Sequence, residues 1–135
     1  MPTVSDPNGE TAPGAPLTPD LALAYLGELS TDIRAAAVLD EAGGLAAQSG
    51  FDEDGVDQVR ELVGDLFERA ADAAPGEPAP GQVEVALPEG SVYAVREHGW
   101  TLAVVAGRFA LSSLMFFDLR MVARDLAGLS QGATS

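Results

Sequence analysis

The sequence contains no cysteine and no lysine, so all seven of its basic residues are arginine. The lack of cysteine excludes disulfides, thiolate zinc sites and a cysteine nucleophile. The lack of lysine excludes a phosphate-binding loop completed by lysine and a Schiff-base lysine. Because the side chains on which catalysis most often depends are scarce, we expect a protein that is not an enzyme and that has no metal and no cofactor.

The sequence also has no apolar run of the ~18 residues that a membrane span needs. Its start has neither the basic residues nor the apolar block of a signal peptide. We therefore expect a soluble, cytoplasmic protein with no direct membrane insertion. A formal net charge of −14 should repel nucleic acid, so a basic protein surface is the more natural partner. Acidity that serves solubility alone is the alternative.

The length of 135 residues suits one domain, and a hydrophobic content of 47% is enough for a core. Residues 1–16 carry four prolines and no apolar pattern, which indicates a flexible tail. We expect one folded domain over 17–129 and a flexible end at 130–135. Residues 75–81 are too rich in proline and glycine for a helix or a strand.

Three segments have the pattern of helices. The first begins at Thr18 as cap, with Pro19 in the first turn, and ends near Ser30. The second begins at Asp52, and the third has Ser112 or Ser113 as cap. The apolar stripes expected to be buried are Leu21, Tyr25, Leu26 and Leu29 in the first helix and Met115, Leu119, Val122 and Leu126 in the third, which Gly128 ends.

The alanine-rich segment 33–50 has poor helical periodicity, although alanine favours helices. Its residues alternate, and the DEAGG stretch supplies turn residues with two glycines free to adopt positive φ. We predict a β-hairpin of Ile33–Asp40 and Leu45–Ser49. Small residues on both faces indicate that neighbouring elements pack closely against it.

The segment 52–73 is an acidic amphipathic helix, in which Phe51 and Val56 form a hydrophobic staple. Its apolar face is broader than one neighbour needs, so one edge can rest on a sheet while the other meets another helix. The apolar positions are Val56, Val59, Val63, Leu66, Ala70 and Ala73, widened by Leu62 and Phe67.

Three strands are expected after the loop, at 82–87, 91–97 and 100–107, with His98-Gly99 as a two-residue turn. Residues 102–106 are apolar on both faces, as in a central strand covered on two sides. The order is α-β-β-α-β-β-β-α. This order predicts an α+β fold, an α/β sandwich in which helices cover both faces of one five-stranded antiparallel sheet.

This order, with the hairpin VLDEAGGLAAQSG before an amphipathic helix and the closing LAVVAGRFALSSLMFFDLRMVARDL, resembles the roadblock family of dynein-light-chain-like domains over residues 18–128. The resemblance implies a profilin-like architecture and a homodimer or heterodimer. In such dimers the third strands pair into one continuous sheet and the second helices pack antiparallel. It also implies a bacterial signalling module that accompanies a small Ras-like GTPase, with further signalling proteins nearby.

The residues themselves also favour a homodimer. Strand 82–87 follows a loose loop and should lie at a sheet edge, where an apolar strand is rarely left bare. If two copies pair across a two-fold axis, each covers the other's edge strand and the broad apolar face of its helix. In a monomer, the loop 75–81 or the tail 1–16 would cover the edge instead. The expected interface residues are Val56, Val59, Val63, Leu66, Ala70, Val83, Val85 and Leu87.

The acidic helix face is the expected site for another partner, through Asp57, Arg60, Glu61, Asp65 and Glu68. A plain solvated face is the alternative. His98 has no nucleophile in a suitable context and reads as an exposed turn residue. The acids at 52–54 lack the spacing of a calcium loop and read as helix-capping residues. Gly43, Gly44 and Gly50 fit turns better than a phosphate loop.

The aromatic residues expected in the core are Trp100, Phe109, Phe116 and Phe117. Because Phe116 and Phe117 cannot point the same way on a helix, one of the two is expected to lie near the surface or to bridge to the sheet. The leading hypothesis is a non-enzymatic homodimeric module that binds and regulates or scaffolds a small GTPase. A small-ligand sensor or a general protein-interaction domain of profilin-like fold is the alternative, since such sandwiches can hold a pocket beside the sheet.

Overall fold

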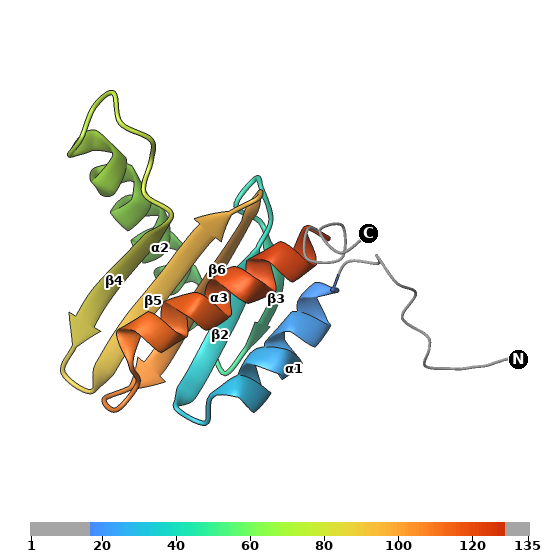
Figure 1. Ribbon diagram of the computed structural model, residues 1–135. Helices are drawn as coiled ribbons and strands as arrows, with labels where there is room; N and C mark the ends of the chain where they lie inside the picture. Colours follow the sequence, from blue (N-terminus) through green and yellow to red (C-terminus); the bar gives the residue numbers. More distant parts are fainter. Residues whose placement is uncertain (1–16, 129–135) are drawn as a thin grey trace, which may run out of the picture.

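The computed structural model of the protein describes residues 17–128. The tails expected at 1–16 and 130–135 lie outside the described residues, as does residue 129. The described elements follow the expected order (Figure 1). They are α1 (Pro19–Leu29), β2 (Ile33–Leu39), β3 (Leu45–Ser49), α2 (Glu53–Asp72), β4 (Gln82–Leu87), β5 (Gly90–Glu97), β6 (Trp100–Gly107) and α3 (Ser112–Leu126).

The five strands form one antiparallel sheet in the order β3-β2-β6-β5-β4. Helices α1 and α3 lie on one face of this sheet and α2 lies on the other (Figure 1). The three-layer α+β sandwich expected from the sequence is therefore confirmed. Strand β6 is central, while β3 and β4 are the two edges.

The central strand is apolar on both faces because each face has its own core. Leu102 and Val104 of β6 point into the cluster beneath α1 and α3, whereas Ala103 joins the cluster beneath α2. Side chains alternate between the two sides of a strand, so this division follows directly from the sequence.

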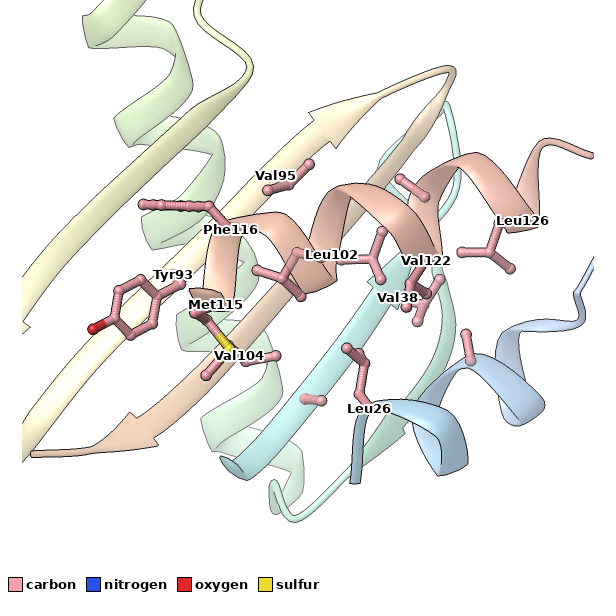
Figure 2. Packing of buried hydrophobic residues seen from close by; sticks show 14 of the residues in the cluster. Leu26, Val38, Tyr93, Val95, Leu102, Val104, Met115, Phe116, Val122 and Leu126 are labelled. Carbon is pink, nitrogen blue, oxygen red and sulfur yellow. The ribbon is translucent and has the colours of Figure 1, made fainter. Parts of the chain in front are cut away.

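The larger core lies between the sheet and the helix pair α1 and α3 (Figure 2). Leu26 of α1 and Val122 of α3 are fully buried there against Val38 of β2. The rings of Tyr93 and Phe116 meet edge to face, with centroids 5.5 Å apart and an interplanar angle of 84°. The stripe predicted for α3, from Met115 to Leu126, is buried as expected.

The stripe predicted for α1 was partly wrong. Thr18 caps the helix, its Oγ1 accepting from the Leu21 N–H at 3.2 Å. However, Leu21 and Leu29 are exposed, and the fully buried residues are Ala22 and Leu26. A short helix on the flank of α3 buries a narrow face, where a small alanine permits close packing.

The alanine-rich segment forms the predicted hairpin, with its first strand one residue shorter than expected. Asp40 closes the turn, because its carboxylate accepts from the N–H groups of Ala42 (3.0 Å) and Gly44 (2.8 Å). Only Gly43 of the two turn glycines has positive φ, at 86°. Ala35, Ala36 and Ala37 are buried between the two helical layers, so the small side chains serve close packing, as expected.

The predicted cap of α3 was wrong. Leu111 occupies the N-cap without a side-chain hydrogen bond, and Ser112 and Ser113 lie inside the helix. The Ser112 hydroxyl instead lies 3.2 Å from Glu84 Oε2 and 3.4 Å from Tyr93 Oη. Because a serine that reaches a neighbouring strand cannot also turn back to cap its own helix, tertiary contact overrides the local signal.

Candidate protein-interaction surface

Strand β4 has a partner on one side only, β5, and is the last strand of the sheet (Figure 1). The N–H of Arg96 donates to the carbonyl of Gly81 at 2.9 Å, which makes this a hydrogen-bonded pair of the antiparallel ladder. Such pairs alternate along two strands. The backbone hydrogen bonds to β5 are therefore made by Val83, Val85 and Leu87. The backbone N–H and C=O groups that point away from β5, toward the free edge, belong to Gln82, Glu84 and Ala86.

The loop 75–81 does not occupy this edge. Its residues are exposed, apart from half-buried Gly81, and the backbone hydrogen bonds of 74–77 stay within the loop and the end of α2. Among the described residues, no backbone hydrogen bond reaches the outer side of β4. The hypothesis that the loop 75–81 covers the β4 edge in a monomer is therefore unsupported. The tail 1–16, the other segment considered for this role, lies outside the described residues.

The broad apolar face of α2 divides into two stripes. Val56, Val59 and Val63 are buried in the chain's own second core with Phe67, against β5 and β6. Leu62, Leu66 and Ala70 form an adjacent i, i+4, i+8 stripe that is only half-buried. Of the expected α2 interface positions, Leu66 and Ala70 therefore keep surface for a partner, while the three valines pack against the sheet.

The half-buried stripe and the β4 edge lie on the same side of the molecule. Val83 and Leu62 each pack against the second core beneath α2, so the apolar face of β4 points toward α2. Val83 and Val85 are half-buried and Leu87 is exposed. We call Leu62, Leu66, Ala70 and the strand Gln82–Leu87 the edge surface.

The acidic residues of α2 expected to meet another partner are exposed: Asp57, Glu61, Asp65 and Glu68. Two arginines are held among them. Arg60 Nη2 donates to the Gly43 carbonyl at 3.0 Å and Nη1 lies 3.6 Å from Asp57, while Arg69 pairs with Asp65 at 3.1 Å. The acidic face is thus solvent-exposed and predominantly negative, and Arg60 is engaged with the β2–β3 turn.

His98 lies in the β5–β6 turn with φ 57°, followed by Gly99 at 85°, as the turn prediction requires. Its Nε2 is 3.7 Å from Glu97 Oε1, and Glu97 also pairs with Arg120 at 2.9 Å. Asp52 caps α2 by accepting from the Gly55 N–H, as expected. No group of three or more potential metal-ligating side chains gathers within 17–128.

The expectation that the four large aromatic residues are core residues holds for Phe116 and, in part, for Trp100, which packs at the margin of the first core. It was wrong for Phe109, which is exposed, whereas the exposure of Phe117 agrees with the expectation that only one of the two consecutive phenylalanines faces the core. Phe117 follows Phe116 on α3 and must point away from the sheet, while Phe109 lies in the β6–α3 loop beyond the core.

Asp118 is a buried charged residue that the sequence analysis did not single out. It is only 8% exposed and lies among the buried residues of α3. Burial raises the pKa of its carboxyl above the ordinary value. The signal was present, since Asp118 follows Met115 by three positions and precedes Val122 by four, which places it on the buried stripe.

The geometry defines an α+β sandwich in which the free edge at β4 lies beside a half-buried helical stripe of α2. The sequence matches no protein-family model and no curated protein. Solved structures, however, share the fold of this chain. A Roadblock/LC7 domain from Streptomyces avermitilis superimposes with a TM-score of 0.69 at 22% identity, over 80% of this chain and 93% of that one. The resemblance drawn from the sequence is thereby confirmed, and the chain has a roadblock-like fold.

Two further structures extend the comparison. MglB with a tetrameric arrangement has a TM-score of 0.66 at 18% identity, covering 85% of this chain and 91% of that chain. LokiProfilin2 in complex with rabbit actin has a TM-score of 0.59 at 16% identity, covering 82% and 96%. The profilin-like side of the predicted architecture is thus also confirmed. No helix within 17–128 has the length and hydropathy to cross a membrane.

Proposed function

We propose that this protein is a homodimeric roadblock-like module that binds a small Ras-like GTPase and regulates or scaffolds it. The observation that carries the dimer is the edge surface, where an unpaired strand lies beside the half-buried stripe of α2. Two copies pair β4 with β4 across a two-fold axis, and their α2 helices pack over the joint sheet. The related fold of MglB, seen in a tetrameric arrangement, supports self-association.

The alternating hydrogen-bond pattern of β4 restricts how it pairs with β4 of a second copy. Only Gln82, Glu84 and Ala86 direct backbone N–H and C=O groups toward the partner, so the two-fold axis lies at Val83, Glu84 or Val85. Centring on Glu84 uses all three residues of each strand, whereas the other two registers use only two. The extra pair of backbone bonds is worth about 0.5–1.5 kcal/mol each, which outweighs a repulsion of about 0.2–1 kcal/mol between opposed carboxylates. We favour the Glu84-centred register.

The dimer is tested by light scattering of the full chain. Val85→Arg places a charge in the joint and should give monomers, while Ala46→Arg adds the same charge to an exposed position of the other edge strand, β3, and should leave the dimer intact. A monomeric wild type, or a Val85→Arg variant that remains a dimer, overturns the proposal.

The GTPase partner is inferred from the roadblock-like fold together with charge. The exposed acids of α2 and the net charge of −14 complement a basic patch, and such complementarity mainly sets the association rate and partner choice. The mechanism is binding: a rigid platform favours one nucleotide state of the partner through differential contacts. Arg60 is bound to the β2–β3 turn, so any faster hydrolysis arises from repositioning the partner's own groups rather than from Arg60.

The partner is tested by capture from native lysate, using the full chain as bait with GDP or with a non-hydrolysable GTP analogue. We expect a protein with a GTPase domain, identified by mass spectrometry, in one nucleotide condition and not in the other. Combining Asp57→Asn, Glu61→Gln and Asp65→Asn should reduce this capture, while Asp20→Asn with Glu28→Gln on α1 should not. No nucleotide-dependent capture of a GTPase contradicts the assignment, even if the dimer is intact.

A small-ligand sensor is less well supported. A ligand sensor needs a pocket beside the alanine-rich strands, but Ala36, Ala37 and Val38 are buried and packed in the two cores. A general protein-interaction domain remains compatible with the edge surface, and the nucleotide arms of the capture experiment distinguish it from a GTPase-binding module.

A further inference from the structure

A second surface lies on the opposite side of the sheet from α2, between the end of α1 and the beginning of α3. There the α1–β2 turn meets the β6–α3 loop around a groove of about 170 Å³. Its walls include Leu29 of α1, Phe109 and Leu111 of the loop, and Leu114 of α3. These four large apolar side chains are all exposed, and Phe109 reaches 85% exposure.

Exposed apolar side chains gathered in one place mark binding surfaces more often than scattered ones do. Phe117 is also exposed and follows Leu114 by three positions, so it extends the same face of α3. None of these residues belongs to the edge surface or to the acidic face of α2. The groove is therefore a separate site that the proposed dimer leaves open.

Asp118 lies at this groove and adds a carboxylate to its apolar walls. The residue lines the groove although it is more than nine-tenths buried. Within residues 17–128, its carboxylate has neither a hydrogen bond nor an ion pair. Loss of water raises the pKa of this carboxyl, which agrees with a carboxylate that lacks a compensating partner.

The groove contains a second acid, Asp32, whose N–H is bonded to Ser30 Oγ at 3.2 Å. Arg34 and Arg108 are exposed nearby in sequence, but neither forms an ion pair with these acids among the described residues. The chain segments outside the described residues, 1–16 and 129–135, contain no lysine, arginine or histidine. No cationic side chain within 17–128 pairs with Asp118, so its carboxylate is available to a cation from another molecule.

We propose that this groove binds an apolar segment of a partner protein that carries one arginine or lysine, with the cation placed on Asp118. The aliphatic stem of such a side chain passes between Leu111 and Leu114 while its charged end reaches the carboxylate. Flanking apolar residues of the segment rest on Leu29 and Phe109. A charge-assisted hydrogen bond in this half-enclosed setting is stronger than a neutral one, and it selects for the basic residue.

The test is an NMR titration of the full chain with a blocked Leu-Arg-Leu peptide and with the same peptide carrying citrulline, a neutral isostere of arginine. We expect shifts at the amides of Leu114 and Asp118, and affinity about tenfold higher for the arginine peptide. Asp118→Asn should abolish this preference while both peptides still bind weakly. Asp72→Asn, which removes the same charge from an exposed position of α2, should retain the preference.

Several results overturn the proposal. These are no shifts at millimolar peptide, equal affinity for the two peptides, or a preference that survives Asp118→Asn. Phe109→Ser and Leu111→Ser should weaken both peptides without changing the oligomeric state. If these two substitutions convert the protein to a smaller species, a second copy of the chain occupies the groove. That result would also overturn the proposal of a partner segment. Circular dichroism confirms that each variant is folded.

Discussion

Arg60 Nη2 donates to the carbonyl oxygen of Gly43 at 3.0 Å, joining the middle of α2 to the turn between β2 and β3. This contact links residues that are far apart in sequence. The same guanidinium lies 3.6 Å from Asp57, and Arg69 pairs with Asp65, whereas Glu61 and Glu68 are exposed and have no ion pair among the described residues.

We predict that Arg60→Ala lowers the free energy of unfolding by about 1 kcal/mol, because it removes one hydrogen bond that ties α2 to the hairpin. The cost stays moderate because Arg60 Nε is already buried without a partner in the described part of the chain. Arg69→Ala is the matched control and should cost less than about 0.5 kcal/mol, since its pair with Asp65 is exposed. Urea unfolding followed by circular dichroism measures both, and equal losses would refute the distinction.

Glu84→Gln should tighten the proposed dimer by up to about fivefold, because it removes the repulsion between carboxylates opposed across the two-fold axis. The glutamine can still accept from Ser112, as Glu84 does. Dilution followed by light scattering measures the dissociation constant. If the axis lies at Val83 or Val85, Glu84 faces a neutral residue and the substitution leaves the constant unchanged.

Single cysteines provide a direct measure of the same register, since the natural chain has none. A residue on the two-fold axis faces its own copy at a distance that a disulfide can span. Under mild oxidation, Glu84→Cys should therefore form a crosslinked dimer more rapidly than Val83→Cys or Val85→Cys. The fastest crosslinking at either valine would reject the Glu84-centred register while retaining the dimer.

Asp118 makes the stability of the fold depend on pH in an unusual direction. Its folded-state pKa is raised by desolvation, so the folded state holds this proton more tightly than the unfolded chain does. The contribution of Asp118 to stability is therefore greatest below the ordinary carboxyl pKa and is lost as pH rises through the raised folded value. Asp118→Asn should gain stability relative to the wild type at neutral pH, and less at acidic pH.

Thermal unfolding at acidic and at neutral pH measures this difference. Asp72→Asn controls for the loss of one negative charge and should show no such pH-dependent gain. An Asp118→Asn variant with the same stability as wild type at both pH values would contradict the role assigned to desolvation.

Two glycines should respond oppositely to alanine. A Cβ at Gly90 would lie 2.0 Å from the Ala106 carbonyl oxygen, so Gly90→Ala forces β5 and β6 apart and should cost more than about 2 kcal/mol. At Gly64, inside α2, a Cβ meets nothing within 4 Å, so Gly64→Ala should stabilise by about 0.5–1 kcal/mol. Denaturant midpoints measure both changes, and a tolerated Gly90→Ala would show that the strands can separate locally.

The sequence by itself determined the order of elements and the location of most of the core. The alternation in β2, the run of apolar residues on both faces of β6 and the i, i+4 spacing in α2 and α3 are local patterns, and they are present whatever the neighbours are. The hairpin turn followed from Asp40 and the adjacent glycines for the same reason. These signals lie within a few residues of one another and can be read without a tertiary structure.

Only the tertiary structure decided which apolar residues remain exposed. Val63 and Leu66 both belong to the apolar face of α2, but the position of the sheet buries the first and leaves the second partly open. Ser112 was expected to cap its helix, yet the approach of β4 gave it Glu84 as a partner. The groove at Asp118 exists because the end of α1 meets the β6–α3 loop, and no local pattern encodes a meeting of segments so distant in sequence.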